Sequence, residues 1–241
     1  MNQAKEVKSE SGKAGGFISV AIDGPAGAGK STVAKRVAAE LGYLYVDTGA
    51  IYRTVGYHMK LMGIGAKDSD GIRRCIDDVN IELDYQDDGV QHMILNGRDV
   101  TELIRTPEIS MMASGVSAQS CVRSYLLDMQ RRLAQTHNVV MDGRDIGTVV
   151  LPRAQVKIYL TAAVEIRAER RYKELLARGE KLRYEEVYAD VVKRDEQDMS
   201  RPVAPLKCAD DAVVVDGSHM TVQQVVAEIK AIIRRKAEAH D

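Results

Sequence analysis

The fold of this chain is decided by the stretch Gly24-Pro25-Ala26-Gly27-Ala28-Gly29-Lys30-Ser31, which has the pattern G-x-x-x-x-G-K-S. The apolar, β-rich run 17–22 precedes it, and residues 31–41 follow it with helical spacing that ends at Gly42. A strand that turns through glycines into a helix directs several backbone N–H groups, and the positive end of the helix dipole, at one point. The stretch therefore predicts a loop that cradles phosphate groups.

Two side chains of this loop carry chemistry. The ammonium of Lys30 is expected to reach the β- and γ-phosphates of a nucleoside triphosphate, and the hydroxyl of Ser31 is expected to ligate Mg²⁺. The alternative, a purely structural glycine turn, is disfavoured because the motif and its flanks agree. The residues expected to bind the triphosphate are Gly24, Pro25, Ala26, Gly27, Ala28, Gly29, Lys30, Ser31 and Thr32.

Composition narrows the class of protein. The 241 residues are 45% hydrophobic and 29% charged, which is typical of a globular protein. A net charge of −1 and the lack of Trp argue against a nucleic-acid partner, and no apolar run is long enough for a membrane span. Residues 1–16 predict a disordered tail without the apolar core of a signal peptide. Three distant cysteines indicate free thiols in a reducing compartment, so we expect a cytoplasmic protein. We also expect a monomer whose partners are small molecules.

The rest of the chain alternates between strand and helix patterns. Beyond the first strand, strands are predicted at 43–47, 138–142, 156–160 and 212–216, and helices at 51–62, 107–135 with a break, 164–178, 184–199 and 221–237. This alternation predicts an α/β fold in which a five-stranded parallel sheet is flanked by helices. The triplet Thr48-Gly49-Ala50 is expected to cap the helix at 51–62.

Residues 66–106 have a different character. Apolar and polar residues alternate over 79–85 and again over 90–95, and the turn signals 86–89 and Asn96-Gly97 follow the two runs. We interpret this segment as an inserted antiparallel subdomain, with 17–65 and 107–241 forming the core. The pattern alone leaves open whether the insert caps a substrate or is decoration.

Charged groups follow two of the predicted strands, and ligands of open parallel sheets gather at that rim. Arg53 lies about one turn after the Thr48 hydroxyl and is either a phosphate clamp or a solvated helix residue. The sequence Asp142-Gly143-Arg144-Asp145 follows a buried strand, where a second carboxylate of a phosphate-loop enzyme holds Mg²⁺ directly or through water. We favour this function over a solvated turn because the loop shares the rim with the phosphate cradle.

Two helices add further arginines. Arg167, Arg170 and Arg171 form one basic stripe on the first, followed by a possible hinge at Gly179. Such a stripe is either a lid that neutralises a transferring phosphoryl group or a solvated face. On the next helix Arg194, Asp198 and Arg201 share one face, and these charges alone would favour an exposed, ion-paired helix.

Taken in order, these motifs resemble the nucleoside monophosphate kinases, and more narrowly the bacterial cytidylate kinase family, over residues 17–235. The resemblance is carried by the segments Ile22–Thr32, Asp47–Arg53, Asp142–Val150 and Arg194–Leu206. It implies a P-loop kinase fold with a nucleoside-monophosphate-binding insert at 66–106 and a short helical lid near 167–183. It also implies ATP-dependent phosphorylation of CMP and dCMP to the diphosphates, with Mg²⁺ as cofactor.

The resemblance assigns roles residue by residue. Lys30, Arg144, Arg194 and Arg170 are implied to be catalytic, and Arg167 and Arg170 to contact ATP. Thr48, Arg53, Arg144 and Arg201 fall where the family holds the acceptor phosphate and sugar. Ser114, Arg123 and Asp145 fall where it reads cytosine, and Arg194 and Asp198 near the sugar and the closing lid.

Two alternatives stay open at this stage. One is a kinase of the same fold that acts on UMP, AMP or shikimate. The other is a P-loop nucleotide switch, against which the chain shows no N-K-x-D motif.

Overall fold

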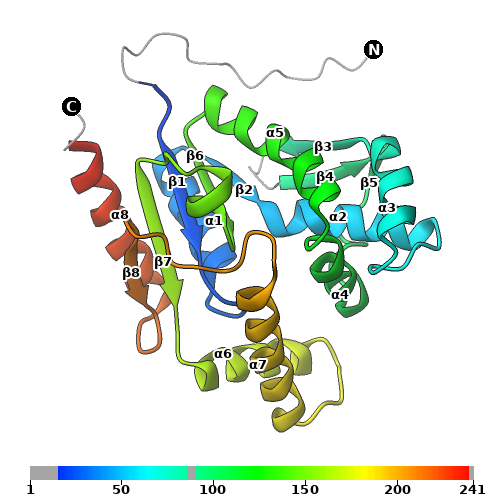
Figure 1. Ribbon diagram of the computed structural model, residues 1–241. Coiled ribbons are helices and arrows are strands. Elements are labelled where there is room, and N and C mark those ends of the chain that lie inside the picture. The colour runs from blue at the N-terminus through cyan, green and yellow to red at the C-terminus, as the bar shows by residue number, and fades with distance from the viewer. Residues whose placement is uncertain (1–15, 86–90, 239–241) are drawn as a thin grey trace.

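The computed structural model describes residues 16–85 and 91–238. Its main element is a five-stranded parallel sheet with helices on both faces, and a smaller three-stranded antiparallel sheet lies to one side (Figure 1). The α/β fold predicted from the sequence is confirmed. The predicted tail at 1–16 falls almost entirely outside the described residues.

The large sheet has its first strand at the centre. Its strands are β1 (Ser19–Asp23), β2 (Leu44–Asp47), β6 (Val139–Gly143), β7 (Val156–Thr161) and β8 (Val213–Asp216). They are arranged as β2-β6-β1-β7-β8, and every neighbouring pair is parallel. β1 and β6 are buried at every position because both of their faces are covered.

Two apolar cores lie on opposite faces of this sheet. On one face α1 (Lys30–Leu41) and α8 (Val222–Glu238) pack against Val20 and Ile22 of β1. On the other face α2 (Thr48–Leu61), α4 (Pro107–Val116) and α5 (Ser120–Thr136) pack with Ala21. The alternation along β1 follows from the period of two residues per strand repeat.

The segment 66–106 forms its own small sheet. Its strands are β3 (Ile81–Tyr85), β4 (Gln91–Leu95) and β5 (Arg98–Asp99), joined in the order β3-β4-β5. Asn96 and Gly97 both have positive φ, 48° and 80°, which confirms the predicted tight turn between β4 and β5. The turn signal at 86–89 lies outside the described residues.

Further elements surround the carboxyl ends of the parallel strands. α6 (Val164–Ala177) and α7 (Tyr184–Ser200) follow β7, and Figure 1 shows them beyond the ends of β1 and β7. A π-helical turn (Ile146–Val150) follows β6. In the part of the chain that the structure describes, no helix is long and apolar enough to cross a membrane.

Two local predictions were wrong. α2 begins at Thr48, three residues early, because the Asp47 side chain is the cap and accepts from the backbone N of Ala50 at 2.8 Å. The insert also contains a helix that the sequence interpretation missed, α3 (Ser69–Cys75), followed by a 3₁₀ turn (Ile76–Asp78). Asp68 caps α3 by accepting from Gly71 N at 2.9 Å.

Candidate active site

The glycine-rich loop links β1 to α1 and passes close to neighbouring backbone. At Gly24 φ is +148°, and a Cβ would lie 1.9 Å from the carbonyl oxygen of Leu160. At Gly27 φ is +75°, and a Cβ would lie 3.2 Å from Arg167. Side chains at either position would displace the loop, so both glycines are required by the path of the backbone.

Lys30 is the first residue of α1 and is buried. Its Nζ donates to the carbonyl oxygen of Pro25 at 2.7 Å. Burial, and then the nearby charge of Arg144, lower the pKa of Lys30 well below its ordinary value. The carboxylates of Asp142 and Asp23 oppose this shift without overcoming it, so a further anion at the loop would stabilise the ammonium.

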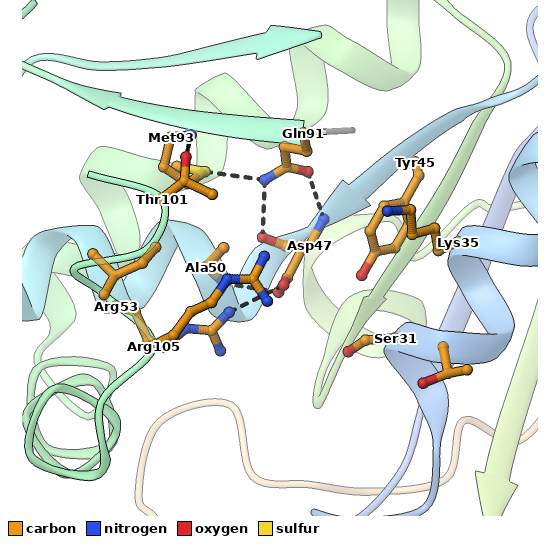
Figure 2. Close-up of a pocket in the computed structure, with 12 residues that line it drawn as sticks. Ser31, Lys35, Tyr45, Asp47, Ala50, Arg53, Gln91, Met93, Thr101 and Arg105 are labelled. Atoms are coloured by element: carbon orange, nitrogen blue, oxygen red, sulfur yellow. Dashed lines mark hydrogen bonds and ion pairs between the residues drawn. The ribbon is translucent and has the colours of Figure 1, made fainter. Parts of the chain in front are cut away.

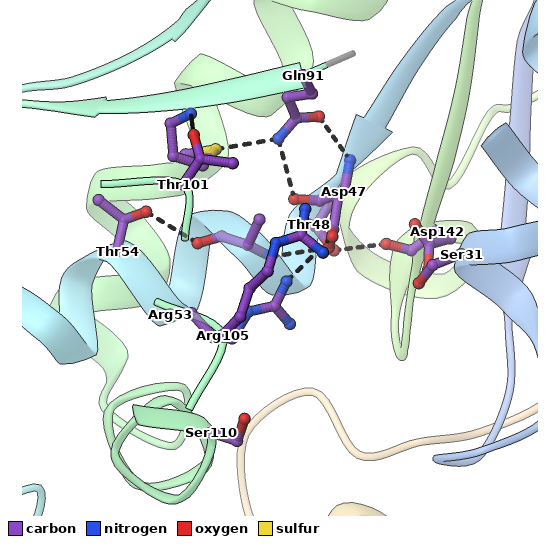
Figure 3. A network of polar contacts seen from close by, with 12 residues as sticks. Ser31, Asp47, Thr48, Arg53, Thr54, Gln91, Thr101, Arg105, Ser110 and Asp142 are labelled. Atoms are coloured by element: carbon purple, nitrogen blue, oxygen red, sulfur yellow. Dashed lines mark hydrogen bonds and ion pairs between the residues drawn. The ribbon is translucent and has the colours of Figure 1, made fainter. Parts of the chain in front are cut away.

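Asp142 stands opposite Lys30 at the end of β6. Its two carboxylate oxygens accept from the hydroxyls of Ser31 at 2.8 Å and Tyr45 at 2.9 Å. Burial, and then repulsion from Asp47, raise the pKa of Asp142 to about 6. Figure 3 shows Ser31 and Asp142 facing each other from α1 and β6.

These oxygens fit a divalent cation such as Mg²⁺, which prefers hard oxygen ligands and keeps several non-protein ligands. The Ser31 hydroxyl and the Asp142 carboxylate supply such oxygens next to the loop. Within 16–85 and 91–238, no group of three or more His, Cys, Asp or Glu residues could enclose a metal ion. The Ser31 hydroxyl and the Asp142 carboxylate could therefore form part of the ligand set of such a cation.

Two arginines, one from α2 and one from the loop after β6, form ion pairs at the rim beyond Asp142. Arg53 of α2 pairs with Asp47 at 3.0 Å, and Arg144 pairs with Asp198 of α7 at 2.7 Å. The Thr48 hydroxyl donates to the carbonyl oxygen of Asp142 at 2.7 Å, which joins α2 to β6 (Figure 3). Burial alone would raise the pKa of Asp198, but Arg144 brings that pKa below its ordinary value.

Asp145 is the centre of a buried charged cluster. One carboxylate oxygen accepts from Arg123 of α5, and the other accepts from Arg201 at 3.1 Å. Arg123 also lies over the ring of Tyr52, 5.7 Å from its centroid. Burial raises the pKa of Asp145 above its ordinary value despite both arginines. In this cluster the carboxylate can accept hydrogen bonds and the guanidinium groups can donate them, so it could bind a ring that carries both a donor and acceptors.

Arg194 of α7 has a buried Nε that, like the Nε of Arg53, has no hydrogen-bond partner among the described residues. Burial, and then the charge of Arg144, lower the pKa of Arg194 to about 10. The remaining predicted residue, Ser114, lies half-buried on α4, and the contacts found among the described residues do not join its hydroxyl to this cluster.

The loop that carries Arg144 and Asp145 is fixed at both ends. The carboxylate of Asp23 accepts from the backbone N of Ile146 at 2.8 Å and of Gly147 at 2.7 Å. Arg131 donates to the carbonyl oxygens that end the π-helical turn, both at 3.0 Å. Burial raises the pKa of Asp23 to about 6, and the two backbone N–H groups oppose this shift.

The basic stripe on α6 does not form one face toward solvent. Arg167 is buried, donates to the carbonyl oxygens of Ala162 and Ala26 at 2.8 and 3.1 Å, and pairs with Asp195 at 2.7 Å. Arg170 donates to the carbonyl oxygen of Gly217 at 2.8 Å, and Arg171 pairs with Glu174 at 2.9 Å. Arg167 thus supports the phosphate loop from behind.

Sequence reasoning missed several residues of this site. Asp23 lies in the segment Ile22–Thr32, but the motif assigned it no role. No role was predicted for Tyr45 or Asp195. Gln91 is buried, and its Oε1 accepts from the backbone N of Asp47 at 2.8 Å, which attaches the insert to β2 (Figure 2). These contacts join residues far apart in the chain, and only the position of Asp23 directly before the glycine loop could have signalled one of them.

A phosphate-cradling loop after the central strand of such a sheet, facing an arginine-rich second pocket, defines a P-loop kinase. Comparison with known proteins identifies the family. The family model described as cytidylate kinase matches residues 20–235. The chain therefore belongs to the cytidylate kinase family, which confirms the resemblance drawn from the motifs.

Curated relatives agree with the family model. The cytidylate kinase of Carboxydothermus hydrogenoformans is 50% identical over 217 residues, covering 90% of this chain and 97% of the relative. That of Caldicellulosiruptor bescii is 46% identical over 212 residues, covering 88% and 93%. That of Geobacter sulfurreducens is 44% identical over 220 residues, covering 91% and 94%.

Proposed function

We propose that this protein transfers the γ-phosphoryl group of ATP to CMP and dCMP, giving CDP and dCDP by in-line displacement. The observation that carries the proposal is the buried Asp145, held between Arg123 and Arg201 at the rim that also bears the phosphate loop. A carboxylate in that position can accept from the N4 amino group of cytosine, as carboxylates do from the same group in DNA.

The donor side is the loop 24–32. Its backbone N–H groups and Lys30 hold the ATP phosphates, with Arg170 approaching from α6. Arg167 acts through the loop, because its guanidinium already binds the carbonyl oxygen of Ala26 at 3.1 Å. Mg²⁺, when bound, would supply charge neutralisation on the transferring phosphoryl group, and Ser31 with Asp142 would hold it.

The acceptor side is supplied by α2, α7 and the loop after β6. Arg53, Arg144 and Arg201 position the acceptor phosphate, and Thr48 and Asp198 orient the phosphate and sugar. The acceptor oxygen is already an anion, so positioning and electrostatic stabilisation carry most of the rate without a strong general base. The Nε of Arg194 has no partner among the described residues. Its guanidinium neutralises the negative charge that develops on the transferring phosphoryl group.

Base reading is the role of Asp145, Arg123 and Ser114. Cytosine offers an amino donor to the carboxylate and acceptors to the guanidinium. Uracil has a carbonyl at position 4, so two acceptors would face each other at a cost of about 1–3 kcal/mol.

A panel of acceptors tests this function directly. With ATP and Mg²⁺, we expect kcat/KM for CMP and dCMP to exceed that for UMP by about tenfold or more, and AMP and shikimate to be poorer still. ADP release measured by a coupled assay gives the values. Equal kcat/KM for CMP and UMP would contradict the base-reading role, and ATP binding without any acceptor turnover would favour a P-loop switch.

Tyr45 gives a second, smaller prediction as a positioning residue. Tyr45→Phe removes the hydroxyl that donates to Asp142 at 2.9 Å, so one carboxylate oxygen loses its orientation. We expect the Mg²⁺ concentration for half-maximal activity to rise about threefold or more, with little change in Tm. Tyr43→Phe is the matched control, since no contact of its hydroxyl is found among the described residues. An unchanged Mg²⁺ dependence would show that Tyr45 does not position Asp142.

We further propose that the protein works as a cytoplasmic monomer and binds no nucleic acid. The net charge of −1 supports the absence of a nucleic-acid partner, and the three free cysteines, Cys75, Cys121 and Cys208, support a reducing compartment.

A further inference from the structure

A cavity of about 220 Å³ lies between α1, the start of α2 and the insert (Figure 2). Ser31 lines it on the side of the phosphate loop, and Arg53 lines it on the acceptor side. The insert contributes the segment that follows β5, including Thr101 and Arg105. The cavity therefore adjoins both halves of the proposed transfer site.

The charges around this cavity do not balance. Three cationic side chains line it, Lys35, Arg53 and Arg105, against the single carboxylate of Asp47. Asp47 already accepts from Arg53 at 3.0 Å and from the backbone N of Ala50 at 2.8 Å. The excess positive charge favours an anion in the cavity.

Of the two arginines that line the cavity, Arg105 is the one with the weaker attachment to protein. Its side chain is 52% exposed, and its Nε lies 3.5 Å from Glu102, whose side chain is 84% exposed. An exposed pair with that separation restrains a guanidinium very little. Figures 2 and 3 show the side chains of Arg53 and Arg105 directed to the same end of the cavity, near Asp47.

Hydrogen bonds hold the backbone of the segment 101–105, which carries Arg105. The Thr101 hydroxyl accepts from the backbone N of Met93 at 2.9 Å, and the backbone N of Thr101 donates to Asp99 at 2.8 Å. The carbonyl oxygen of Arg105 accepts from Arg178 at the end of α6 at 3.4 Å. A fixed backbone that carries a weakly held guanidinium is suited to binding an anion, because little backbone ordering remains to be done on binding.

We propose that Arg105 binds the phosphate group of the acceptor nucleotide from the side of the insert, next to Arg53. The planar guanidinium can bind two phosphate oxygens at once, and the other arginine that lines the cavity, Arg53, is already paired with Asp47 at 3.0 Å. This inference rests on the proposed function for the identity of the nucleotide, and it adds a phosphate ligand that the sequence motifs did not assign.

Binding of CMP and of cytidine, each without ATP, tests this role by calorimetry. We expect Arg105→Ala to weaken CMP binding about tenfold and to leave cytidine binding and the KM for ATP unchanged, while Arg105→Lys retains part of the affinity. Arg98→Ala is the matched control, because Arg98 is an exposed arginine of β5 in the same insert and does not line the cavity. Tm measurements show whether each variant is folded.

Three results would overturn the role of Arg105. These are CMP affinity equal to wild type, an equal loss for CMP and cytidine, or a raised KM for ATP with CMP binding intact. If wild-type protein binds UMP or AMP in place of CMP, the proposed substrate is wrong. The same comparison of nucleotide with nucleoside then still decides whether Arg105 binds the phosphate.

Discussion

Replacement of Lys30 by Met is expected to lower kcat/KM for ATP about 10³-fold while leaving the protein folded. Lys30 is buried at the start of α1, and its only hydrogen bond found in the described chain is to the neutral carbonyl oxygen of Pro25 at 2.7 Å. Its pKa is lowered chiefly by burial and next by Arg144, which together outweigh the opposing effect of the Asp142 and Asp23 carboxylates. A bound triphosphate would add negative charge next to Lys30. Its attraction to the ammonium would be strongest in the transition state, when charge develops on the transferring phosphoryl group.

The stability of the same variant separates this role from a structural one. A methionine of similar length removes a buried charge, so Tm should stay equal to that of wild type or rise. Arg36→Met, an exposed cation on the same helix, should leave both kcat/KM and Tm nearly unchanged. Activity of Lys30→Met within about threefold of wild type would remove Lys30 from the catalytic machinery.

Sequence reasoning was most successful where the signal was local. The glycine loop, the five parallel strands and the turn at Asn96-Gly97 each depend on a few adjacent residues, and the structure has all of them. α3 was missed because seven residues are too few to display helical periodicity, although Asp68 offered a capping signal.

The roles of individual arginines were harder to predict. Helical spacing puts Arg167 and Arg171 on one stripe, but it does not show which of them faces protein. The structure buries Arg167 against the phosphate loop and pairs Arg171 with Glu174 near the surface. No local signal pointed to Tyr45 or Arg105, since the roles proposed for them depend on β6 and α2 lying next to them in space.

Asp142 is the residue for which catalysis and stability are expected to conflict. Burial, and then repulsion from Asp47, raise its pKa from 3.8 to about 6. Between those two pH values the native state therefore binds a proton more tightly than the unfolded chain does. By linkage, the contribution of Asp142 to stability falls as the pH rises through this window. Above about pH 6 the buried carboxylate is ionised, and its full destabilising effect on the folded protein is present.

Asp142→Asn is therefore expected to lose about 10²-fold or more in kcat and to gain stability at the same time. The hydroxyls of Ser31 and Tyr45 can accept as well as donate hydrogen bonds, so they can pair with the new amide. We expect Tm of the variant to exceed that of wild type by about 3–6 °C at pH 8.

The pH dependence of that difference distinguishes a removed charge from improved packing. Asp23 also has a pKa raised to about 6, but it is present in both proteins, so its titration cancels in the comparison. The gap in Tm between Asp142→Asn and wild type should accordingly shrink as the pH is lowered from 8 to 4.5, because wild-type Asp142 is then protonated. Asp84→Asn, a change at an exposed position of β3, should show no such trend. A gap in Tm that is independent of pH would indicate improved packing in place of a removed charge. A less stable variant at pH 8 would mean that the Asp142 carboxylate is stabilised as an anion in the folded protein.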